Sequence, residues 1–190
     1  MAKIKFKAYH GTDASVVNDI LKNGFIYKPN DEHWLGDGIY FFLDENLAEW
    51  WTTNPTKKSG MNIQEPAIIE CTIEIEEEHL LDLRNLKNYT NYVDLYNSFF
   101  REWAFRARDE KVNFKQIRCA FFNYISKVYS VDAIIAPFIV PEQPYMPQYR
   151  DTKYADEMRI MYTEIQLCIN KSQSVIKTKE AHVLSREVLK

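Results

Sequence analysis

Glycine is scarce in this chain and unevenly placed. The 190 residues include only five glycines, and four of them (Gly11, Gly24, Gly36 and Gly38) fall within the first 38 positions. Glycine is used where the backbone adopts a conformation that other residues avoid, or where it must approach another group closely. The sequence therefore predicts that unusual backbone geometry is concentrated near the N-terminal end, with regular helices and strands elsewhere.

The composition indicates one globular domain. The chain is 46% hydrophobic and 14% aromatic with a net charge of −3, which is too apolar for a disordered protein and slightly acidic for one that binds mainly to phosphate backbones. No segment approaches the ~20 apolar residues of a membrane helix, and the start, MAKIKFKAYH, has lysines where a signal peptide has an apolar core. These features predict a soluble, cytoplasmic protein without a membrane partner.

Cysteine usage agrees with a reducing compartment. Cys71, Cys119 and Cys168 are odd in number, widely spaced and set in apolar runs. This pattern is typical of buried thiols, not of a disulfide framework or a zinc site. No metal is expected.

Hydrophobic periodicity predicts an α+β fold, because strands and helices alternate irregularly along the chain. One helix is expected between a cap at Asp13 and a C-terminal Gly24, and another after a cap at Asp44. Further helices are expected over 89–108 and 113–129. The predicted strands cover 4–9, 39–42, 67–76, 131–136, 159–170 and 174–177. The prediction makes 1–177 a single domain, leaves 137–156 as a proline-containing surface loop, and allows a helix in the tail, 178–190.

Three short motifs occur in order near the N-terminus. They are Tyr9-His10-Gly11-Thr12 at the end of a predicted strand, Gly36-Asp37-Gly38-Ile39-Tyr40-Phe41-Phe42 entering the next strand, and Ala48-Glu49-Trp50-Trp51 on the following helix. Singly, each is as easily structural as functional, but an ordered set at these spacings is specific.

Together with Asn23-Gly24-Phe25, these motifs resemble the catalytic domain of the ADP-ribosyltransferases, in the branch of diphtheria toxin and poly(ADP-ribose) polymerase. The resemblance is close over about residues 8–51 and general elsewhere. It implies a split antiparallel β-sheet flanked by helices, with NAD as co-substrate. The implied reaction breaks the nicotinamide–ribose bond and transfers ADP-ribose to a macromolecule.

The resemblance also implies roles for individual residues. His10 is expected to hydrogen-bond a ribose hydroxyl, and Gly11 to pair the nicotinamide carboxamide through its backbone. Tyr40 and Trp50 are expected to hold the cationic nicotinamide ring between two aromatic faces. Thr12 and Gly38 complete the expected NAD-binding set.

The sequence departs from the family pattern at two positions of the helix. Trp50 stands where the family usually has tyrosine, which preserves stacking. Leu47 stands where the family usually has a serine that binds the carboxamide. That hydrogen bond is therefore missing or comes from Asn46 or another residue.

A carboxylate near the ribose should stabilise the positive charge that develops there as the bond breaks. The family places this glutamate at the start of a late strand, where three residues compete. Glu164 is favoured, Gln166 follows because it shares a face with Glu164, and Glu157 is third. The expected catalytic set is thus His10, Tyr40 and Glu164.

The sequence says less about the macromolecule that accepts ADP-ribose. The loop 138–156, with Tyr145, Tyr149 and Arg150, is expected to meet a protein or a nucleic acid. Residues 101–118 carry six basic and three acidic side chains, which is more typical of a solvated helix face.

The expected activity is that of a mono-ADP-ribosyltransferase. A stand-alone chain of this size resembles the small bacterial or phage toxin and defence members, for which a neutralising antitoxin is a possible partner. Two alternatives stay open. One is an RNA 2′-phosphotransferase, although no arginine precedes Arg84. The other is a degenerate NAD-site fold that only binds a partner.

Overall fold

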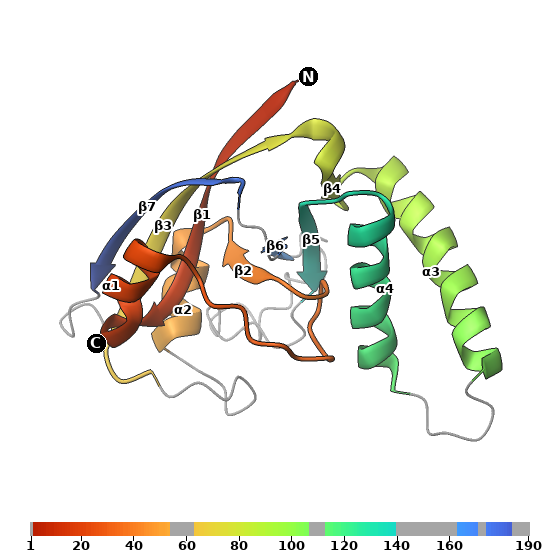
Figure 1. Ribbon diagram of the computed structural model, residues 1–190, viewed down its shortest axis with the longest axis horizontal. Helices are drawn as coiled ribbons and strands as arrows, with labels where there is room; N and C mark the ends of the chain where they lie inside the picture. Colours follow the sequence, from red (N-terminus) through yellow and green to blue (C-terminus); the bar gives the residue numbers. More distant parts are fainter. Residues whose placement is uncertain (1, 54–62, 107–112, 140–162, 171–173, 184–190) are drawn as a thin grey trace, which may run out of the picture.

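The computed structural model describes residues 2–53, 63–106, 113–139, 163–170 and 174–183, and the account below concerns these residues. They form a seven-stranded sheet with helices against it (Figure 1). The strands are β1 (Lys3–Asp13), β2 (Ile39–Phe42), β3 (Pro66–Glu76), β4 (Leu80–Asp82), β5 (Ala133–Ile139), β6 (Thr163–Ile169) and β7 (Ile176–Val183). The helices are α1 (Ala14–Asn23), α2 (Glu45–Thr53), the 3₁₀ turn η1 (Glu77–His79), α3 (Leu86–Arg106) and α4 (Phe114–Val128).

The sheet consists of two halves that are barely joined. Its strand order is β4-β5-β6-β2-β1-β3-β7. On one side, β1 pairs with β3 along its whole length, from Lys3 to Asp13. On the other side, β1 meets β2 through a single registered pair, Tyr9 with Phe42. The α+β class is therefore confirmed, whereas the sheet is mixed and not wholly antiparallel, because the short β4 runs parallel to β5.

Two hydrophobic cores cover the two faces of the sheet. Neighbouring residues on one strand alternate between them: Leu167 belongs to the main core, which includes Ile20 of α1, and Cys168 belongs to the second core beneath α4. Figure 1 shows α1 and α2 beside the β1–β3–β7 half, and α3 and α4 beside the other half. Phe121 and Phe122 of α4 are buried in the second core.

Local capping chemistry forms the first two helices as predicted. The Asp13 side chain accepts a hydrogen bond from Ser15 N at 3.0 Å, and Gly24 ends α1 with φ of 88° while its N–H donates to Ile20 O. Before α2, the Asp44 carboxylate accepts from Asn46 N at 2.8 Å.

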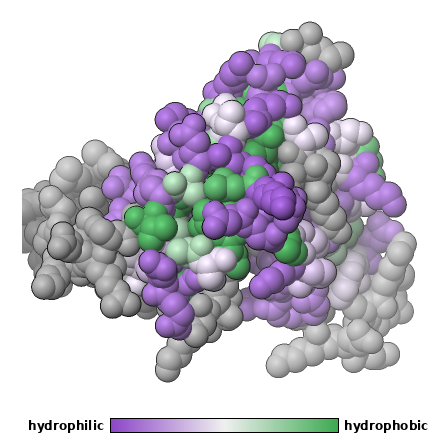
Figure 2. All heavy atoms as spheres, turned by 60° about the vertical axis from the view of Figure 1, so that its left-hand side comes forward, coloured by the Kyte–Doolittle hydropathy of each residue, from purple (hydrophilic) through white to green (hydrophobic). Residues whose placement is uncertain are grey.

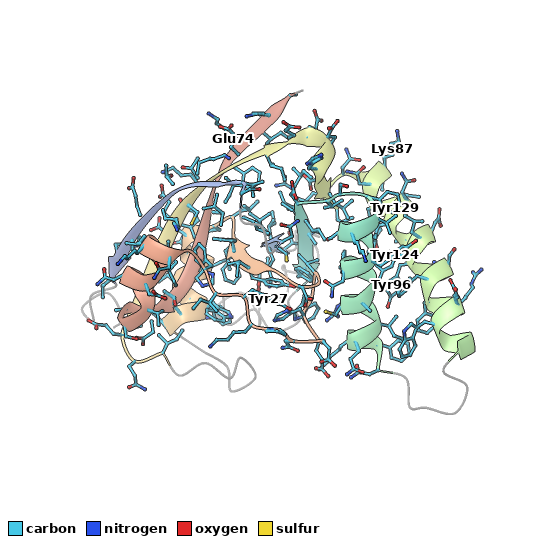
Figure 3. All side chains as sticks on the ribbon, in the orientation of Figure 1. Tyr27, Glu74, Lys87, Tyr96, Tyr124 and Tyr129 are labelled. Carbon is cyan, nitrogen blue, oxygen red and sulfur yellow. The ribbon has the colours of Figure 1, made fainter. Side chains whose placement is uncertain are left out.

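The first half of β1 and the second half of β3 form an arm of the sheet. One face of this arm is polar, and the other contributes Ile73 and Ile75 to the main core. In Figure 2, hydrophilic side chains cover most of the upper part of the molecule, whereas apolar side chains gather near the middle of the face. Lys3 and Lys5 both form ion pairs with Glu74, at 3.0 and 2.9 Å; Figure 3 labels Glu74 on this arm. These pairs hold the Glu74 pKa down at about 2.

The structure corrects several predicted boundaries. The first strand, predicted over 4–9, runs to Asp13 and so includes His10, Gly11 and Thr12. Residues 178–183 are the second part of β7, not a helix, because β3 offers a free sheet edge and Ala181 packs onto the main core. Residues 137–139 belong to β5 and not to a loop. The rest of that loop, 140–156, and the end of the tail, 184–190, lie outside the described residues.

The three cysteines are free and buried, as predicted. Burial raises the pKa of the Cys71 and Cys168 thiols to about 12. Among the helices that the structure describes, none is long and apolar enough to cross a membrane.

Candidate functional site

His10 lies at the junction between the two halves of the sheet. Its Nδ1 is 2.8 Å from the carbonyl oxygen of Tyr40, on the neighbouring β2. Its ring also meets Phe25 and Phe41 edge-on, at 4.9 and 5.6 Å between ring centroids. Two residues of the predicted catalytic set, His10 and Tyr40, are thus in direct contact. The contact involves the main chain of Tyr40 and not its side chain.

This hydrogen bond fixes which nitrogen of His10 carries the proton. A carbonyl oxygen can only accept, so Nδ1 is the donor and the neutral ring leaves Nε2 with a lone pair. Burial lowers the His10 pKa, the opposing effect of the Tyr40 carbonyl being smaller. His10 is therefore neutral at pH 7, and its Nε2 can accept a hydrogen bond from a hydroxyl group.

The Tyr40 hydroxyl holds the preceding turn. It donates to Gly36 O at 2.8 Å and accepts from Leu35 N at 2.7 Å. Burial raises its pKa far above the ordinary value. With both bonds made inside the protein, Tyr40 can offer a ligand its ring but not a free hydroxyl.

The two glycines of this turn are required by packing. Gly36 has φ of 82°, and a Cβ there would lie 2.7 Å from Asn123 Oδ1 on α4. The same amide oxygen accepts from Asp37 N at 2.6 Å. A Cβ on Gly38 would lie 2.4 Å from Ile169 O. The predicted binding residue Gly38 therefore lets the turn pack against β6.

Gly11 has a similar reason to be glycine. A Cβ at this position would lie 1.9 Å from Thr52 Oγ1 and 2.9 Å from Ala48 O, both on α2. The neighbouring Thr12 is buried. Close packing of α2 on β1 thus explains Gly11, and carboxamide pairing by its backbone stays a prediction.

Helix α2 carries the other predicted ring-stacking residue. Trp50 is partly buried on α2. Leu47, at the position of the family serine, is 4% exposed and packs inward. Asn46 is exposed, and its side chain donates to Asp44 Oδ1 at 3.1 Å. The structure therefore gives Asn46 a partner at the helix start and adds no support for it as the replacement for serine.

Glu164, the favoured carboxylate, is 9% exposed on β6. Its Oε1 accepts a hydrogen bond from Gln166 Nε2. Burial raises the Glu164 pKa, and the Gln166 bond opposes that rise only in part. A buried carboxylate with one hydrogen-bond partner among the described residues can stabilise a positive charge that develops near it. The third candidate, Glu157, lies outside the described residues.

The predicted residues are not all brought together. Glu164 and Gln166 share the face of the sheet that carries the Tyr40 ring, whereas the His10 ring packs in the main core on the other face. Tyr40 is opposite Cys168, four residues from Glu164, which is roughly 13 Å along the strand. Gln166 stands between them, opposite Phe42.

Sequence reasoning missed an exposed tryptophan close to Glu164. Trp34 is 52% exposed and meets Phe138 edge-on at 5.1 Å between centroids. Phe138 is directly opposite Glu164 in the β5–β6 ladder. Arg118 of α4 lies over the Trp34 ring, with Cζ 4.2 Å from the centroid. Trp34 lies two residues before the recognised glycine turn, which was the available signal.

The acceptor residues predicted in the long loop, Tyr145, Tyr149 and Arg150, lie outside the described residues. Of that region, the structure places Phe138 in β5.

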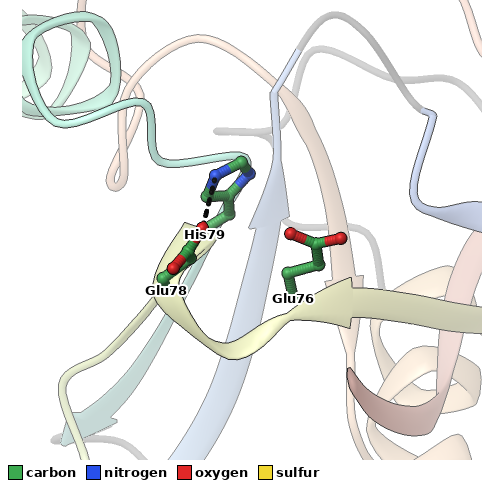
Figure 4. A group of neighbouring side chains, drawn as sticks. All are labelled: Glu76, Glu78 and His79. Carbon is green, nitrogen blue, oxygen red and sulfur yellow. Dashed lines mark ion pairs between the residues drawn. The ribbon is translucent and has the colours of Figure 1, made fainter. Parts of the chain in front are cut away.

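A separate cluster of ionisable side chains lies at η1. The carboxylates of Glu76 and Glu78 and the ring of His79 lie close enough to share a cation (Figure 4). However, His79 Nδ1 is 3.1 Å from Asp132 Oδ2 and its Nε2 is 3.7 Å from Glu78 Oε1. Both ring nitrogens of His79 therefore contact carboxylates, and the contact with Asp132 ties η1 to the start of β5.

A cavity of about 380 Å³ opens between α3 and α4. Its lining is mostly aromatic and includes Phe99, Trp103 and Tyr124 (Figure 3 labels Tyr124 and Tyr129 beside α4). None of the predicted site residues lines it.

Comparison with known proteins gives one distant relative and no family. The chain is 27% identical over 206 aligned positions to an uncharacterized protein of Methanocaldococcus jannaschii, an alignment that covers 99% of this chain and 92% of the relative. No protein-family model matches the chain. No solved structure matches it. The class defined by fold and site is thus an α+β domain with a histidine at the junction of a split sheet.

Proposed function

We propose that the chain is an NAD-consuming mono-ADP-ribosyltransferase of the diphtheria-toxin and poly(ADP-ribose) polymerase type. The observation that carries the proposal is the hydrogen bond from His10 Nδ1 to the Tyr40 carbonyl at the point where the sheet divides. It connects two motifs that are 30 residues apart in the sequence and that the resemblance assigns to one site.

The residues fit the chemical groups of NAD. His10 Nε2 is a hydrogen-bond acceptor and suits a ribose hydroxyl. Beyond Tyr9, β1 has no registered partner on β2, so its backbone edge near Gly11 faces the division of the sheet and suits a carboxamide. The Tyr40 ring, held by its hydroxyl, suits stacking on a cationic ring.

The proposal assigns to Glu164 the negative charge that the reaction needs. Because this side chain and the His10 ring lie on opposite faces of the sheet, NAD must span the junction to meet both. The reaction breaks the bond between ribose C1′ and the nicotinamide nitrogen, and the electron pair leaves with nicotinamide. An oxygen or nitrogen of the acceptor forms the new bond at C1′ and loses its proton to solvent by way of Glu164. An ionised Glu164 stabilises the positive charge on the ribose while the old bond breaks.

The two pKa shifts predict the acid side of the pH profile. Glu164 acts ionised and its pKa is raised, so activity falls as the pH decreases through that raised value. His10 acts neutral, and its lowered pKa extends its neutral range toward acid pH.

Nicotinamide release from labelled NAD tests the proposal. The full chain, incubated with NAD and a cell extract, is expected to release nicotinamide and label a macromolecule. Glu164→Gln is expected to lower the rate about 100-fold or more, the size typical of losing one preorganised electrostatic group. Glu76→Gln, which changes a glutamate at the far end of β3, serves as the control and should keep the rate.

A well-folded wild-type chain that releases no nicotinamide with any extract would refute the transferase. If release occurs and Gln166→Ala abolishes it while Glu164→Gln does not, the assignment of the carboxylate is wrong.

A further inference from the structure

The surface next to Glu164 carries an exposed aromatic ring and an arginine that has unused donors within the described residues. We name this surface the Trp34 shelf and define it by Trp34, Arg118 and Phe138. Trp34 is half exposed although Arg118 lies over its ring and Phe138 packs against its edge. A large exposed aromatic ring held on two sides is preorganised to stack on a flat partner.

Arg118 keeps most of its hydrogen-bonding capacity. Within the described residues its guanidinium makes one long bond, from Nη2 to Glu32 O at 3.5 Å. Its Nε is buried and has no acceptor. The nearby Glu32 carboxylate is engaged by Lys115 at 3.2 Å and by Asn113 at 3.0 Å. Among the described residues Arg118 makes no direct ion pair, although its charge helps to lower the Glu32 pKa, and its remaining N–H groups suit a phosphate.

The shelf lies beside the proposed reacting groups. Phe138 links the two, since its ring lies 5.1 Å from the Trp34 ring between centroids and it is opposite Glu164 across the ladder. Directly opposite residues in a ladder have Cβ atoms about 5 Å apart. A group stacked on Trp34 thus holds its neighbour close to the Glu164 carboxylate.

We infer that the Trp34 shelf binds the acceptor, and that this acceptor is a single-stranded nucleic acid. One nucleotide combines a flat base with an adjacent phosphate, which matches the exposed ring and the guanidinium of Arg118 beside it. The inference rests on the proposed function for the chemistry that follows. In that step, a nitrogen or oxygen of the neighbouring nucleotide forms the bond to ribose C1′ and nicotinamide leaves with the electron pair.

The charges around the shelf predict how binding responds to salt. Arg118 is the one cation of the shelf, and Lys115 is already paired. Each phosphate contact on a single strand contributes about 0.7 to the slope of log K against log salt. The contribution of the shelf should therefore be small and traceable to Arg118, in contrast to binding by a basic surface.

Fluorescence anisotropy of a labelled single-stranded 12-mer, measured without NAD, tests the shelf apart from catalysis. Trp34→Ala is expected to weaken binding about tenfold, because loss of one stacked base typically has an effect of this size. Trp34→Phe should stay within about threefold of wild type. Arg118→Gln should weaken binding and reduce the salt slope by about 0.7. Tyr129→Ala, which removes an aromatic side chain of similar exposure (52%), should bind like wild type.

Three results would overturn the inference. The first is unchanged oligonucleotide binding in Trp34→Ala. The second is a raised KM for NAD in the nicotinamide-release assay of Trp34→Ala without loss of oligonucleotide binding, which would assign the shelf to NAD itself. The third is labelling of protein alone in extracts by wild type, lost in Trp34→Ala, which would make the acceptor a protein.

The experiments can refute the nucleic-acid site at the Trp34 shelf and the proposed transferase activity independently. Oligonucleotide binding that depends on Trp34, in a chain that releases no nicotinamide, leaves the shelf as a nucleic-acid site and refutes the transferase. Nicotinamide release with no nucleic-acid binding refutes the shelf and keeps the enzyme.

Discussion

Glu164 is held in a position that is unfavourable for its charge. The side chain is 9% exposed and burial raises its pKa. The folded state therefore binds this proton more tightly than the unfolded state does. Its contribution to stability is complete below the ordinary carboxyl pKa and is lost as the pH rises through the raised value. A carboxylate kept at such a site is typical of a functional residue.

Glu164→Gln should therefore stabilise the protein at high pH. The amide keeps an oxygen that can accept from Gln166 but carries no charge to desolvate. We expect its Tm at pH 8 to exceed that of wild type by about 2–4 °C, the change that 1 kcal/mol produces in a domain of this size. Near pH 4 the difference should shrink, because wild-type Glu164 is then protonated. Thermal unfolding at both pH values measures this, and a lower Tm for Glu164→Gln at pH 8 would show that the carboxylate supports the fold.

Residues whose role depends on near neighbours were predictable from the sequence. Asp13 caps the start of α1 and Gly24 ends it, each through a hydrogen bond within a few positions. Their roles therefore follow from the capping preferences of aspartate and glycine. The partner of Tyr40 was not predictable in this way. Its hydroxyl closes the turn at Gly36, and its carbonyl meets His10 from a different strand. Trp34 and Arg118 are 84 positions apart, and their contact follows from the packing of α4 against the turn.

At the scale of elements, α2 and β1 pack unusually closely. The contact occurs where Gly11 faces Ala48 and Thr52. The resemblance to transferases and the packing both account for glycine here, so loss of activity in a Gly11 variant would not distinguish them. Stability does distinguish them, because only the packing role affects the protein without ligand.

Gly11→Ala should destabilise the fold by about 1–3 kcal/mol, since the new Cβ lies 1.9 Å from Thr52 Oγ1. Adding Thr52→Ala should restore part of the loss, with a coupling of at least about 0.5 kcal/mol in the double-mutant cycle. Urea unfolding of both single variants and the double variant measures it. If the two substitutions change the free energy of unfolding additively, the new Cβ does not clash with Thr52, and α2 has shifted away from β1 at little cost.

Helices and strands were predicted best where the hydrophobic periodicity is strong. They were predicted poorly where tertiary contacts determine the conformation of the segment. The alternation of Ala67–Glu76 identified β3, and capping located α1 and α2. The segment Ile176–Val183 is β7, although its polar composition also allows a helix. The free edge of β3 determines its conformation, which no local pattern reveals. Likewise, the parallel pairing of β4 with β5 depends on a partner more than 50 positions away.

At the scale of the molecule, the two halves of the sheet share a hydrophobic core but almost no backbone pairing. β1 and β3 share eleven registered pairs, whereas β1 and β2 share one. The His10–Tyr40 hydrogen bond adds a second link at the same place. Local opening follows the elements with few contacts, so the junction is where the sheet should open first.

His10→Ala should therefore increase hydrogen exchange selectively. We expect amides of β2 to exchange at least about tenfold faster than in wild type, while those of β3 keep their protection. Exchange followed by mass spectrometry measures this. Lys5→Ala, on the same strand but in an exposed ion pair with Glu74, is the matched control. Equal acceleration in both strands would show that the halves open as one unit.

The placement of β6 bears on when the protein becomes competent during its synthesis. β2, at Ile39–Phe42, finds four of its partners on β6, at Thr163–Ile169. β6 also carries Glu164, and it fills the gap between β5 and β2. Until those late residues leave the ribosome, the nascent chain can complete neither that half of the sheet nor the proposed site. A prematurely terminated product that stops before residue 163 should therefore lack the proposed activity, because it has neither β6 nor Glu164.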